Sequence, residues 1–165
     1  MCLIQTPRLT LRPFAPEDAP AVLALSQEPG MRRWIPDEVY ADLAEAAETL
    51  DFLIARYPGR ELPYVLAVCR GERLIGHVGL SALLDGVEIG YAIGQADQGR
   101  GYATEATAAL TAWGKRVLGL PFVYGSVEPD NAPSVRVLEK AGYRFDRRER
   151  IGYMGRDVLR HLYRG

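Results

Sequence analysis

The sequence YAIGQADQGRGYATEA, residues 91–106, places glycines and one arginine between an alternating apolar run and the start of a helical pattern. Gly99 and Gly101 weaken both neighbouring elements, because glycine loses more backbone freedom on ordering than any other residue. The N-terminus of a helix offers unpaired N–H groups and the positive end of the helix dipole, so it suits an anion such as phosphate. The stretch therefore predicts a strand–loop–helix unit that binds an anion, with Arg100 adding a charge. A tight turn that only needs positive φ is the alternative.

Two other phosphate-binding loops do not fit the sequence. A P-loop needs the pattern GxxxxGK[ST], and neither Gly-Lys-Ser nor Gly-Lys-Thr occurs in the chain. The segment GRGYAT has the first two glycines of the dinucleotide-binding GxGxxG pattern and lacks the third. It also follows a late strand of a meander, whereas the dinucleotide loop opens a βαβ unit. ATP-binding and NAD-binding modules are disfavoured.

Alternation of apolar residues predicts strands, and apolar residues at three- and four-residue steps predict helices. The expected strands cover residues 8–14, 64–70, 73–83, 87–93, 122–128, 143–150 and 155–163. The expected helices cover 16–26, 41–57, 101–117 and the segment between Asn131 and Gly142, and 28–38 is expected to be a loop. This order predicts an α/β (α+β) fold in one domain, residues 1–165, with a mixed, mostly antiparallel sheet and helices on both faces.

Composition excludes several classes of function. The chain of 165 residues has a net charge of −1, which provides no basic surface for nucleic acid or an anionic membrane. Two cysteines, Cys2 and Cys69, and two histidines, His77 and His161, stand far apart, so a metal site is not expected. The sequence shows no signal peptide and no apolar run of 18 residues, so a cytoplasmic protein is expected.

The loop hexapeptide Gln98-Gly99-Arg100-Gly101-Tyr102-Ala103 resembles the Q/R-x-x-G-x-G/A signature of the GNAT superfamily of acetyl-CoA-dependent N-acetyltransferases. Ala103 stands where many members have glycine. TPRLTLRPF, EIGYAIG, GYATEA and EPDNAPSVRVLEKAGYRF resemble, in order, the branch that contains the ribosomal-protein-alanine N-acetyltransferases. The resemblance spans residues 6–163 and is weakest in 28–62, where the family varies its acceptor-binding elements.

The resemblance implies how acetyl-CoA binds. Backbone N–H groups from Gln98 to Thr104 are expected to bind the pyrophosphate, while the strands at 87–93 and 122–128 splay apart and hold the pantetheine arm between them. Asn131 matches the family asparagine near this arm, and Ser134 matches a residue near the sulfur. The expected coenzyme-binding residues are Ile89, Tyr91, Ile93, Gln98, Gly99, Arg100, Gly101, Tyr102, Ala103, Thr104, Asn131 and Ser134.

Acetyl transfer to an amine needs a base, and Glu88 is the first candidate. Its side chain points to the opposite face of the strand from Ile89, and burial could raise its pKa. A strand glutamate paired with an arginine is the alternative reading. Glu128 at the end of the next strand is a weaker rival, a water could also accept the proton, and Glu105 is expected on the helix flank.

Ser134 is expected to donate a hydrogen bond to the leaving thiolate, or else to serve only in the first turn of its helix. The resemblance implies that a backbone N–H of the 87–93 strand stabilises the oxyanion, and Gly90 keeps that backbone uncrowded unless it only forms a β-bulge. Trp34 is a candidate wall of the acceptor site. Five other residues or groups receive structural readings: His77 and His161 as sheet residues, Cys69 and Tyr143 as core residues, and the arginines at 147, 148 and 150 as a solvated strand face.

The predicted function is direct, metal-free transfer of acetyl from acetyl-CoA to a primary amine. An N-terminal amine of ribosomal-protein type is favoured, because an α-amine with a pKa of ~8 is easier to deprotonate than a lysine at ~10.4. A small amine acceptor (an amino sugar, a polyamine or an antibiotic) and a non-catalytic acyl-CoA sensor remain the alternatives. Either a monomer or a homodimer is compatible with the sequence.

Overall fold

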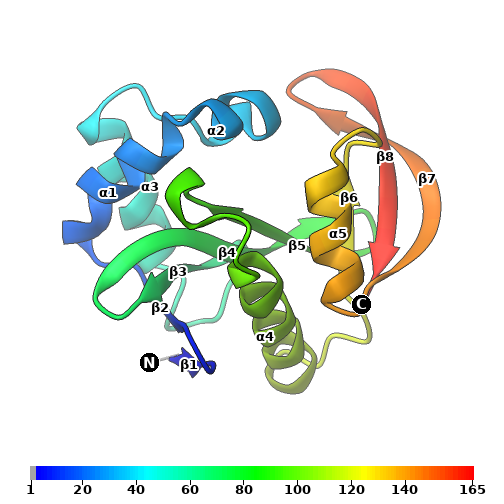
Figure 1. Cartoon of the computed structure of the whole chain (residues 1–165), viewed down its shortest axis with the longest axis horizontal. Coiled ribbons are helices and arrows are strands. Elements are labelled where there is room, and N and C mark those ends of the chain that lie inside the picture. The colour runs from blue at the N-terminus through cyan, green and yellow to red at the C-terminus, as the bar shows by residue number, and fades with distance from the viewer. Residues whose placement is uncertain (1–2) are drawn as a thin grey trace.

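The computed structural model describes residues 3–165, which form one eight-stranded sheet in the order β1-β2-β3-β4-β5-β6-β8-β7 (Figure 1). The strands are β1 (Ile4–Gln5), β2 (Thr10–Arg12), β3 (Tyr64–Arg70), β4 (Arg73–Leu83), β5 (Gly86–Ile93), β6 (Tyr124–Val127), β7 (Arg144–Tyr153) and β8 (Arg156–Arg164). The helices are α1 (Ala19–Ser26), α2 (Pro29–Trp34), α3 (Leu43–Ile54), α4 (Tyr102–Val117) and α5 (Ala132–Lys140). Short 3-10 turns are η1 (Pro16–Asp18), η2 (Pro36–Glu38) and η3 (Gln95–Asp97). No helix in the described part of the chain is long and apolar enough to cross a membrane.

The sheet is mixed and mostly antiparallel, as the sequence predicts. Every neighbouring pair of strands is antiparallel except β5 and β6, which run parallel. A parallel pair needs a crossover connection, and α4 supplies it between β5 and β6. The sequence segment that opens this crossover is the glycine-rich loop.

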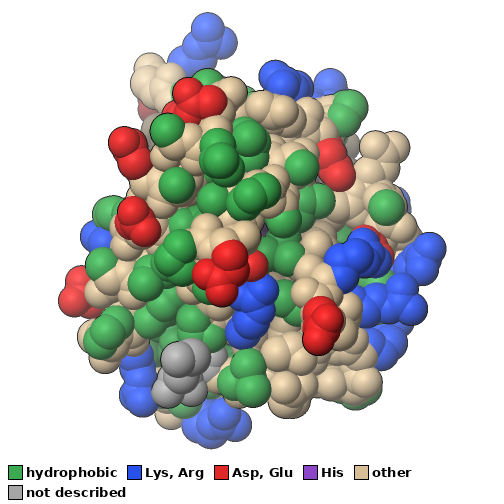
Figure 2. Space-filling model, turned by 90° about the vertical axis from the view of Figure 1, so that its left-hand side faces the viewer, with side chains coloured by type: hydrophobic (Ala, Val, Ile, Leu, Met, Phe, Trp, Pro, Cys, Tyr) green, Lys and Arg blue, Asp and Glu red, His purple; other side chains and the backbone are tan. Residues whose placement is uncertain are grey.

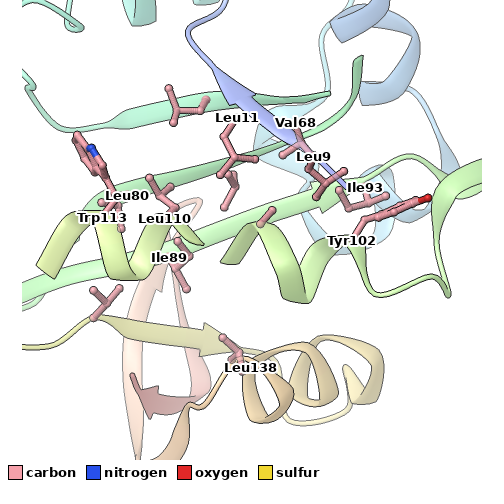
Figure 3. Packing of buried hydrophobic residues seen from close by; sticks show 14 of the residues in the cluster. Leu9, Leu11, Val68, Leu80, Ile89, Ile93, Tyr102, Leu110, Trp113 and Leu138 are labelled. Atoms are coloured by element: carbon pink, nitrogen blue, oxygen red, sulfur yellow. The ribbon is translucent and has the colours of Figure 1, made fainter. Parts of the chain in front are cut away.

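Helices cover both faces of the sheet, because successive residues of a strand point to opposite faces. In β3, Leu66 and Val68 belong to the larger core cluster together with Leu110 of α4, while Ala67 and Cys69 pack with Leu50 of α3. Figure 3 shows the α4 side of this arrangement, with Leu110 and Trp113 directed at the strands and Leu138 entering from α5. The prediction of helices on both faces is confirmed.

The parallel strands β5 and β6 pair over only two residues each. Glu88 lies opposite Tyr124 and Ile89 opposite Gly125, and no further pairing joins the two strands. β5 nevertheless continues to Ile93, fully paired with β4 on its other side. The expected divergence of these two strands is therefore present, and residues 90–93 present an unpaired backbone edge to the gap.

The N-terminal third of the chain differs from the sequence prediction in three places. Residues 28–38 were expected to be a loop and instead contain α2 and η2. Pro29 and Pro36 each occupy the first turn of their element, where proline needs no N–H partner, so residues that look like breakers act as helix starts. The strand expected at 8–14 narrows to Thr10–Arg12, because Pro13 has no N–H to donate, and the additional strand β1 was not predicted.

Candidate active site

The loop between β5 and α4 exposes a continuous run of backbone donors. Gly99 and Gly101 have φ of +74° and +81°, the left-handed region that glycine adopts without steric cost. Within residues 3–165, none of the N–H groups from Gly99 to Thr104 donates to a protein acceptor. A side-chain carbon added at Gly99 would meet no atom within 4 Å. Six clustered N–H groups at a helix N-terminus form an open cradle for an anion.

A hydrogen-bonded clamp fixes the start of α4 to the segment before β2. The Arg8 side chain donates from Nε to Glu105 at 2.7 Å and from Nη1 to the Arg100 carbonyl at 2.8 Å. Its guanidinium also lies 4.7 Å from the centre of the Tyr102 ring. The Thr6 hydroxyl donates to Glu105 at 2.6 Å. Glu105 thus lies on the helix flank, as expected, and the pairing that it makes with Arg8 was not predicted.

A second clamp fixes the loop to the end of the β3–β4 hairpin. Arg73 forms two hydrogen bonds, at 2.7 and 2.8 Å, with the buried carboxylate of Asp97. The hydrogen bonds to Arg73 lower the pKa of Asp97 against the cost of desolvation, so this carboxylate stays ionised. The Gln98 amide donates to the Ile93 carbonyl at 2.9 Å, which ties the loop to the end of β5. The donor cradle is therefore held rigid before any ligand arrives.

Two side chains meet across the gap between β5 and α5. The Tyr91 hydroxyl lies 2.7 Å from the Ser134 Oγ and 3.0 Å from the Ser134 carbonyl oxygen. Asn131 caps α5 by accepting from the Ser134 N–H at 3.3 Å. Burial raises the pKa of Tyr91 to about 12, so its proton is retained at neutral pH. The sequence analysis named Tyr91 as a coenzyme-binding residue of the 87–93 strand, but it did not predict the hydrogen bonds of its hydroxyl group.

The remaining predicted loop and strand residues fall into two groups. The side chains of Ile89, Ile93 and Tyr102 are buried in the larger core cluster, so only their main chains face the gap and the cradle. Arg100 is exposed, whereas Ala103 is partly buried against the core cluster. The cradle thus offers a ligand mainly backbone N–H groups, with the Arg100 side chain as an accessible cation.

The side chain of Glu88 lies on the face of β5 that points away from α4. In the antiparallel ladder it stands directly across from Ser81 of β4. Desolvation raises its pKa to about 7; the charge of Arg160 acts in the opposite direction, while those of Asp37 and Glu38 add to the rise. In the described part of the chain no hydrogen bond or ion pair holds this carboxylate. It is placed to exchange a proton near neutral pH.

The turn η2 brings two more carboxylates to this face. Glu38 Oε2 lies 2.9 Å from His77 Nε2, and Asp37 accepts a hydrogen bond from the Tyr153 hydroxyl on β7. Burial acts to lower the pKa of His77, but the charge and hydrogen bond of Glu38 outweigh it and raise the pKa. His77 is thus a partnered sheet histidine, as expected, although its partner was not foreseen. The Asp37–Tyr153 contact links η2 to the tip of the β7–β8 hairpin.

A cavity of about 460 Å³ lies beside these carboxylates, under α1, α2 and α3. Asp37, Glu38, His77 and Ser81 line one part of it. Its other walls are mostly apolar, and include Val22, Leu25, Met31, Leu50, Leu53 and Val65. Figure 2 views the molecule from the side where α1 and α3 lie, and shows hydrophobic side chains with acidic and basic ones scattered among them. Sequence reasoning found no signal for this cavity, because its walls come from segments far apart in the chain.

The other sequence candidates have structural partners. Glu128 lies 3.9 Å from Arg160. Cys69 and Tyr143 are buried in the core, and the Tyr143 hydroxyl bonds the Thr111 hydroxyl at 2.5 Å. The Trp34 ring stacks under the Arg33 guanidinium at 4.3 Å, and Trp34 does not line the cavity. His161 pairs with Val127 in the sheet. The side chains of Arg148 and Arg150 are exposed, whereas Arg147 is half-buried and donates a hydrogen bond to Glu149. Among the described residues, no group of three or more histidine, cysteine or carboxylate side chains is arranged to hold a metal.

Comparison with known proteins identifies the family. Residues 8–144 match the model of the acetyltransferase (GNAT) domain. The chain is 28% identical over 144 residues to the uncharacterized N-acetyltransferase YnaD of Bacillus subtilis, a match that covers 86% of this chain and 82% of that protein. It is 26% identical over 144 residues to the uncharacterized N-acetyltransferase p20 of Bacillus licheniformis, covering 85% of this chain and 81% of that protein.

Solved structures show the same fold. An acetyltransferase from Agrobacterium tumefaciens superposes with a TM-score of 0.79 at 28% identity, over 100% of this chain and 94% of that one. A ribosomal-protein-S5-alanine acetyltransferase from Vibrio fischeri gives 0.85 at 17% identity, over 100% and 96%. RimL, a ribosomal L7/L12 α-N-protein acetyltransferase solved in complex with coenzyme A, gives 0.83 at 17% identity, over 99% and 97%.

The family model and the named relatives together define an acyl-transfer enzyme. The chain belongs to the GNAT acetyltransferase family. It is an N-acetyltransferase, and the family to which it belongs uses acetyl-CoA and acts on amine acceptors. The residues of this chain suit that coenzyme: the unpaired N–H groups of Gly99–Thr104 match a pyrophosphate, and the unpaired edge of residues 90–93 matches an extended amide-containing arm.

Proposed function

We propose that the protein transfers acetyl directly from acetyl-CoA to a primary amine, at the gap between β5 and β6. The observation that carries this proposal is the continuity of unsatisfied backbone from the open edge of residues 90–93 to the donor cradle of Gly99–Thr104. One extended ligand with an anionic end pairs with both. Acetyl-CoA, when bound, supplies an activated acetyl thioester, and the chain supplies the groups that hold it and move protons.

Glu88 is the proposed general base. Its pKa of about 7 means that a large fraction is ionised at neutral pH while its basicity stays high, which is the balance that proton transfer needs. It projects from the strand whose edge holds the arm, on the face that bears the cavity. An amine bound in the cavity would lie on the same face of the sheet as Glu88, across the ladder from Ser81.

Ser134 is the proposed hydrogen-bond donor to the leaving sulfur, and Tyr91 is proposed to orient it. Asn131 fixes the first turn of α5, which places the Ser134 hydroxyl at the gap beside the Tyr91 hydroxyl. A thiol has a pKa of ~8.5, so its thiolate leaves with modest assistance. One hydrogen bond from this pair is enough to steady it. Ser134 accordingly acts as a hydrogen-bond donor and Tyr91 as the group that orients it.

The acceptor that the sequence favours is a protein N-terminal amine of ribosomal-protein type. Its support is the lower pKa of an α-amine and the fold shared with the two ribosomal-protein acetyltransferases. The second candidate is a small amine. The cavity favours it, because a 460 Å³ space under three helices encloses a small molecule more readily than a polypeptide.

An assay of free thiol release tests the proposal. The protein is incubated with acetyl-CoA and single acceptors, namely peptides with free N-termini and small primary amines, and acetylation is checked by mass. Thiol release that depends on the acceptor and falls strongly in Glu88→Gln supports the proposal. Acetyl-CoA binding without acceptor-dependent release from any amine would count for a sensor instead.

A further inference from the structure

The cavity under α1, α2 and α3 is lined by both acidic and apolar side chains. Asp37 and Glu38 bring carboxylates to it from η2, and Ser81 joins them from β4. The apolar walls come from other elements: Val22 and Leu25 from α1, Leu50 and Leu53 from α3. A ligand that fills this space therefore carries a cation at one end and an apolar group at the other.

Two observations place the acidic side chains of the cavity on the same face of the sheet as the proposed base. Ser81, which lines the cavity, stands directly across the ladder from Glu88, so the two side chains share a face of neighbouring strands. Glu38 lies 2.9 Å from His77, which is on the same strand and the same face as Ser81. The charges of Asp37, Glu38 and Arg160 also act on the pKa of Glu88. An ammonium group held by the carboxylates would thus lie on the same face of the sheet as Glu88.

The size of the cavity sets what the apolar part accepts. A dry cavity of roughly 150 Å³ lined by leucine, isoleucine and phenylalanine is large enough for benzene. At about 460 Å³, this cavity exceeds that by about a factor of three. A methyl or hydroxymethyl group would leave most of it empty. Further ammonium groups of a polycationic acceptor would lie against mostly apolar walls, where the remaining carboxylate of the lining, Glu28, already accepts the Gln95 N–H at 2.8 Å.

We propose that the acceptor amine is attached to a bulky apolar group, of the size of a leucine or aromatic side chain or larger, which fills the cavity under α1, α2 and α3. This inference rests on the proposed function and specifies its acceptor. It disfavours alanine and serine N-termini, polyamines and amino sugars. The same chemistry can come from a free alkyl or arylalkyl amine or from a peptide that begins with a large apolar residue.

An acceptor series tests the proposal on the intact protein. The first arm compares ethylamine, butylamine and hexylamine, whose amines are similar and whose chains differ in length. The second arm compares one peptide that begins with glycine, alanine, leucine or phenylalanine. Spermidine and kanamycin are the hydrophilic comparison. Each buried methylene is expected to raise kcat/KM about fourfold, so hexylamine is expected to exceed ethylamine by on the order of a hundredfold. The arm in which kcat/KM rises more steeply with the size of the apolar group shows whether the acceptor is a free amine or a peptide.

A cavity-filling variant provides the matched control. Val22→Phe places a larger side chain in the cavity and is expected to cut the advantage of hexylamine over ethylamine by at least tenfold. Leu43→Phe makes a similar enlargement at an exposed position of α3 outside the cavity, and it is expected to leave the series unchanged. Calorimetric binding of acetyl-CoA and the thermal midpoint are measured for both variants, so that a folding defect is recognised. Binding of hexylamine in the absence of acetyl-CoA gives a readout independent of turnover.

The outcomes separate this inference from the proposed function. Turnover of spermidine, kanamycin or alanine-initiated peptides in preference to the apolar acceptors overturns the inference and leaves acetyl transfer intact. Equal kcat/KM across both arms, or hexylamine that binds Val22→Phe as well as the wild type, also overturns it. Failure of acetyl-CoA itself to bind would instead remove the proposed function.

Discussion

The Tyr91 hydroxyl donates to the Ser134 carbonyl at 3.0 Å and lies 2.7 Å from the Ser134 Oγ. A tyrosine hydroxyl has one proton, so while Tyr91 donates to the carbonyl the Ser134 hydroxyl donates in the second bond. When Tyr91 donates to the Ser134 Oγ instead, the Ser134 proton is free for a bound sulfur. This pair connects β5 with the first turn of α5, beside the part of the gap where β5 has no partner from β6. The two hydroxyls therefore form one unit, and neither is a simple cap.

Tyr91→Phe and Ser134→Ala are expected each to lower kcat by about tenfold, because the second removes the donor to the leaving sulfur and the first removes the hydroxyl that orients it. Since the residues act as a unit, the double variant should lose little more than either single variant. Acetyl-CoA affinity should change by less than about threefold, because most of its contacts are with the main chain. Steady-state kinetics and calorimetry check both statements, and losses that multiply in the double variant would show that the two act independently.

Glu88→Gln is expected to lower kcat/KM by at least about a hundredfold at neutral pH, the range of an effective general base. In the wild type, kcat/KM should rise as the pH increases through about 7, because Glu88 must lose its proton to act. The pH profile of kcat/KM is measured with two acceptors whose amine pKa values differ. The rise near pH 7 should occur at the same pH with both acceptors, and it should be absent in Glu88→Gln. A rise whose midpoint changes with the acceptor would assign the ionisation to the amine.

Glu88 should also affect stability in a pH-dependent way. Its pKa is raised from 4.5 to about 7 in the folded protein, so its contribution is most favourable below pH 4.5 and is lost as the pH rises through 7. Glu88→Gln removes the cost of burying the charge. It should raise the free energy of unfolding by up to about 3 kcal/mol at pH 8 and by much less at pH 5. Urea unfolding at the two pH values measures this, and a variant less stable at pH 8 would contradict it.

Gly101→Asp is expected to weaken acetyl-CoA binding by more than tenfold, because it places a carboxylate at the proposed pyrophosphate site. Gly119→Asp is the matched control. Gly119 has a similar φ of +69° and no atoms within 4 Å of an added side-chain carbon, but it lies beyond the other end of α4. The backbone strain is thus comparable and the distance from the cradle is large. Calorimetry measures the affinity of both variants for acetyl-CoA. Equal losses of affinity would assign the effect to backbone strain.

Much of the fold could be predicted because each element carries local signals. Asn131 before Pro133 and the glycine at 142 mark α5, and alternating apolar residues mark the meander that leads to Gly99. The start of the chain was less predictable, because Pro29 and Pro36 resemble breakers out of context. Their place in a first helical turn depends on packing of neighbouring segments.

The backbone part of the candidate site could be predicted from the sequence. The contacts between side chains that are distant in the sequence could not. Gly99 and Gly101 indicate the cradle by their conformational freedom alone. The pairing of Arg8 with Glu105 spans 97 residues, and the Glu38–His77 pair spans two unconnected elements, so no local pattern reveals either. The raised pKa of Glu88 likewise depends on tertiary burial.

A crystal structure of the protein with coenzyme A tests directly whether the loop before α4 binds the pyrophosphate. We expect pyrophosphate oxygens within hydrogen-bonding distance of N–H groups of Gly99–Thr104. We also expect that the pantetheine arm runs along residues 90–93, with the sulfur near Ser134. A coenzyme bound elsewhere on the protein, with these N–H groups facing only solvent, would contradict this binding mode.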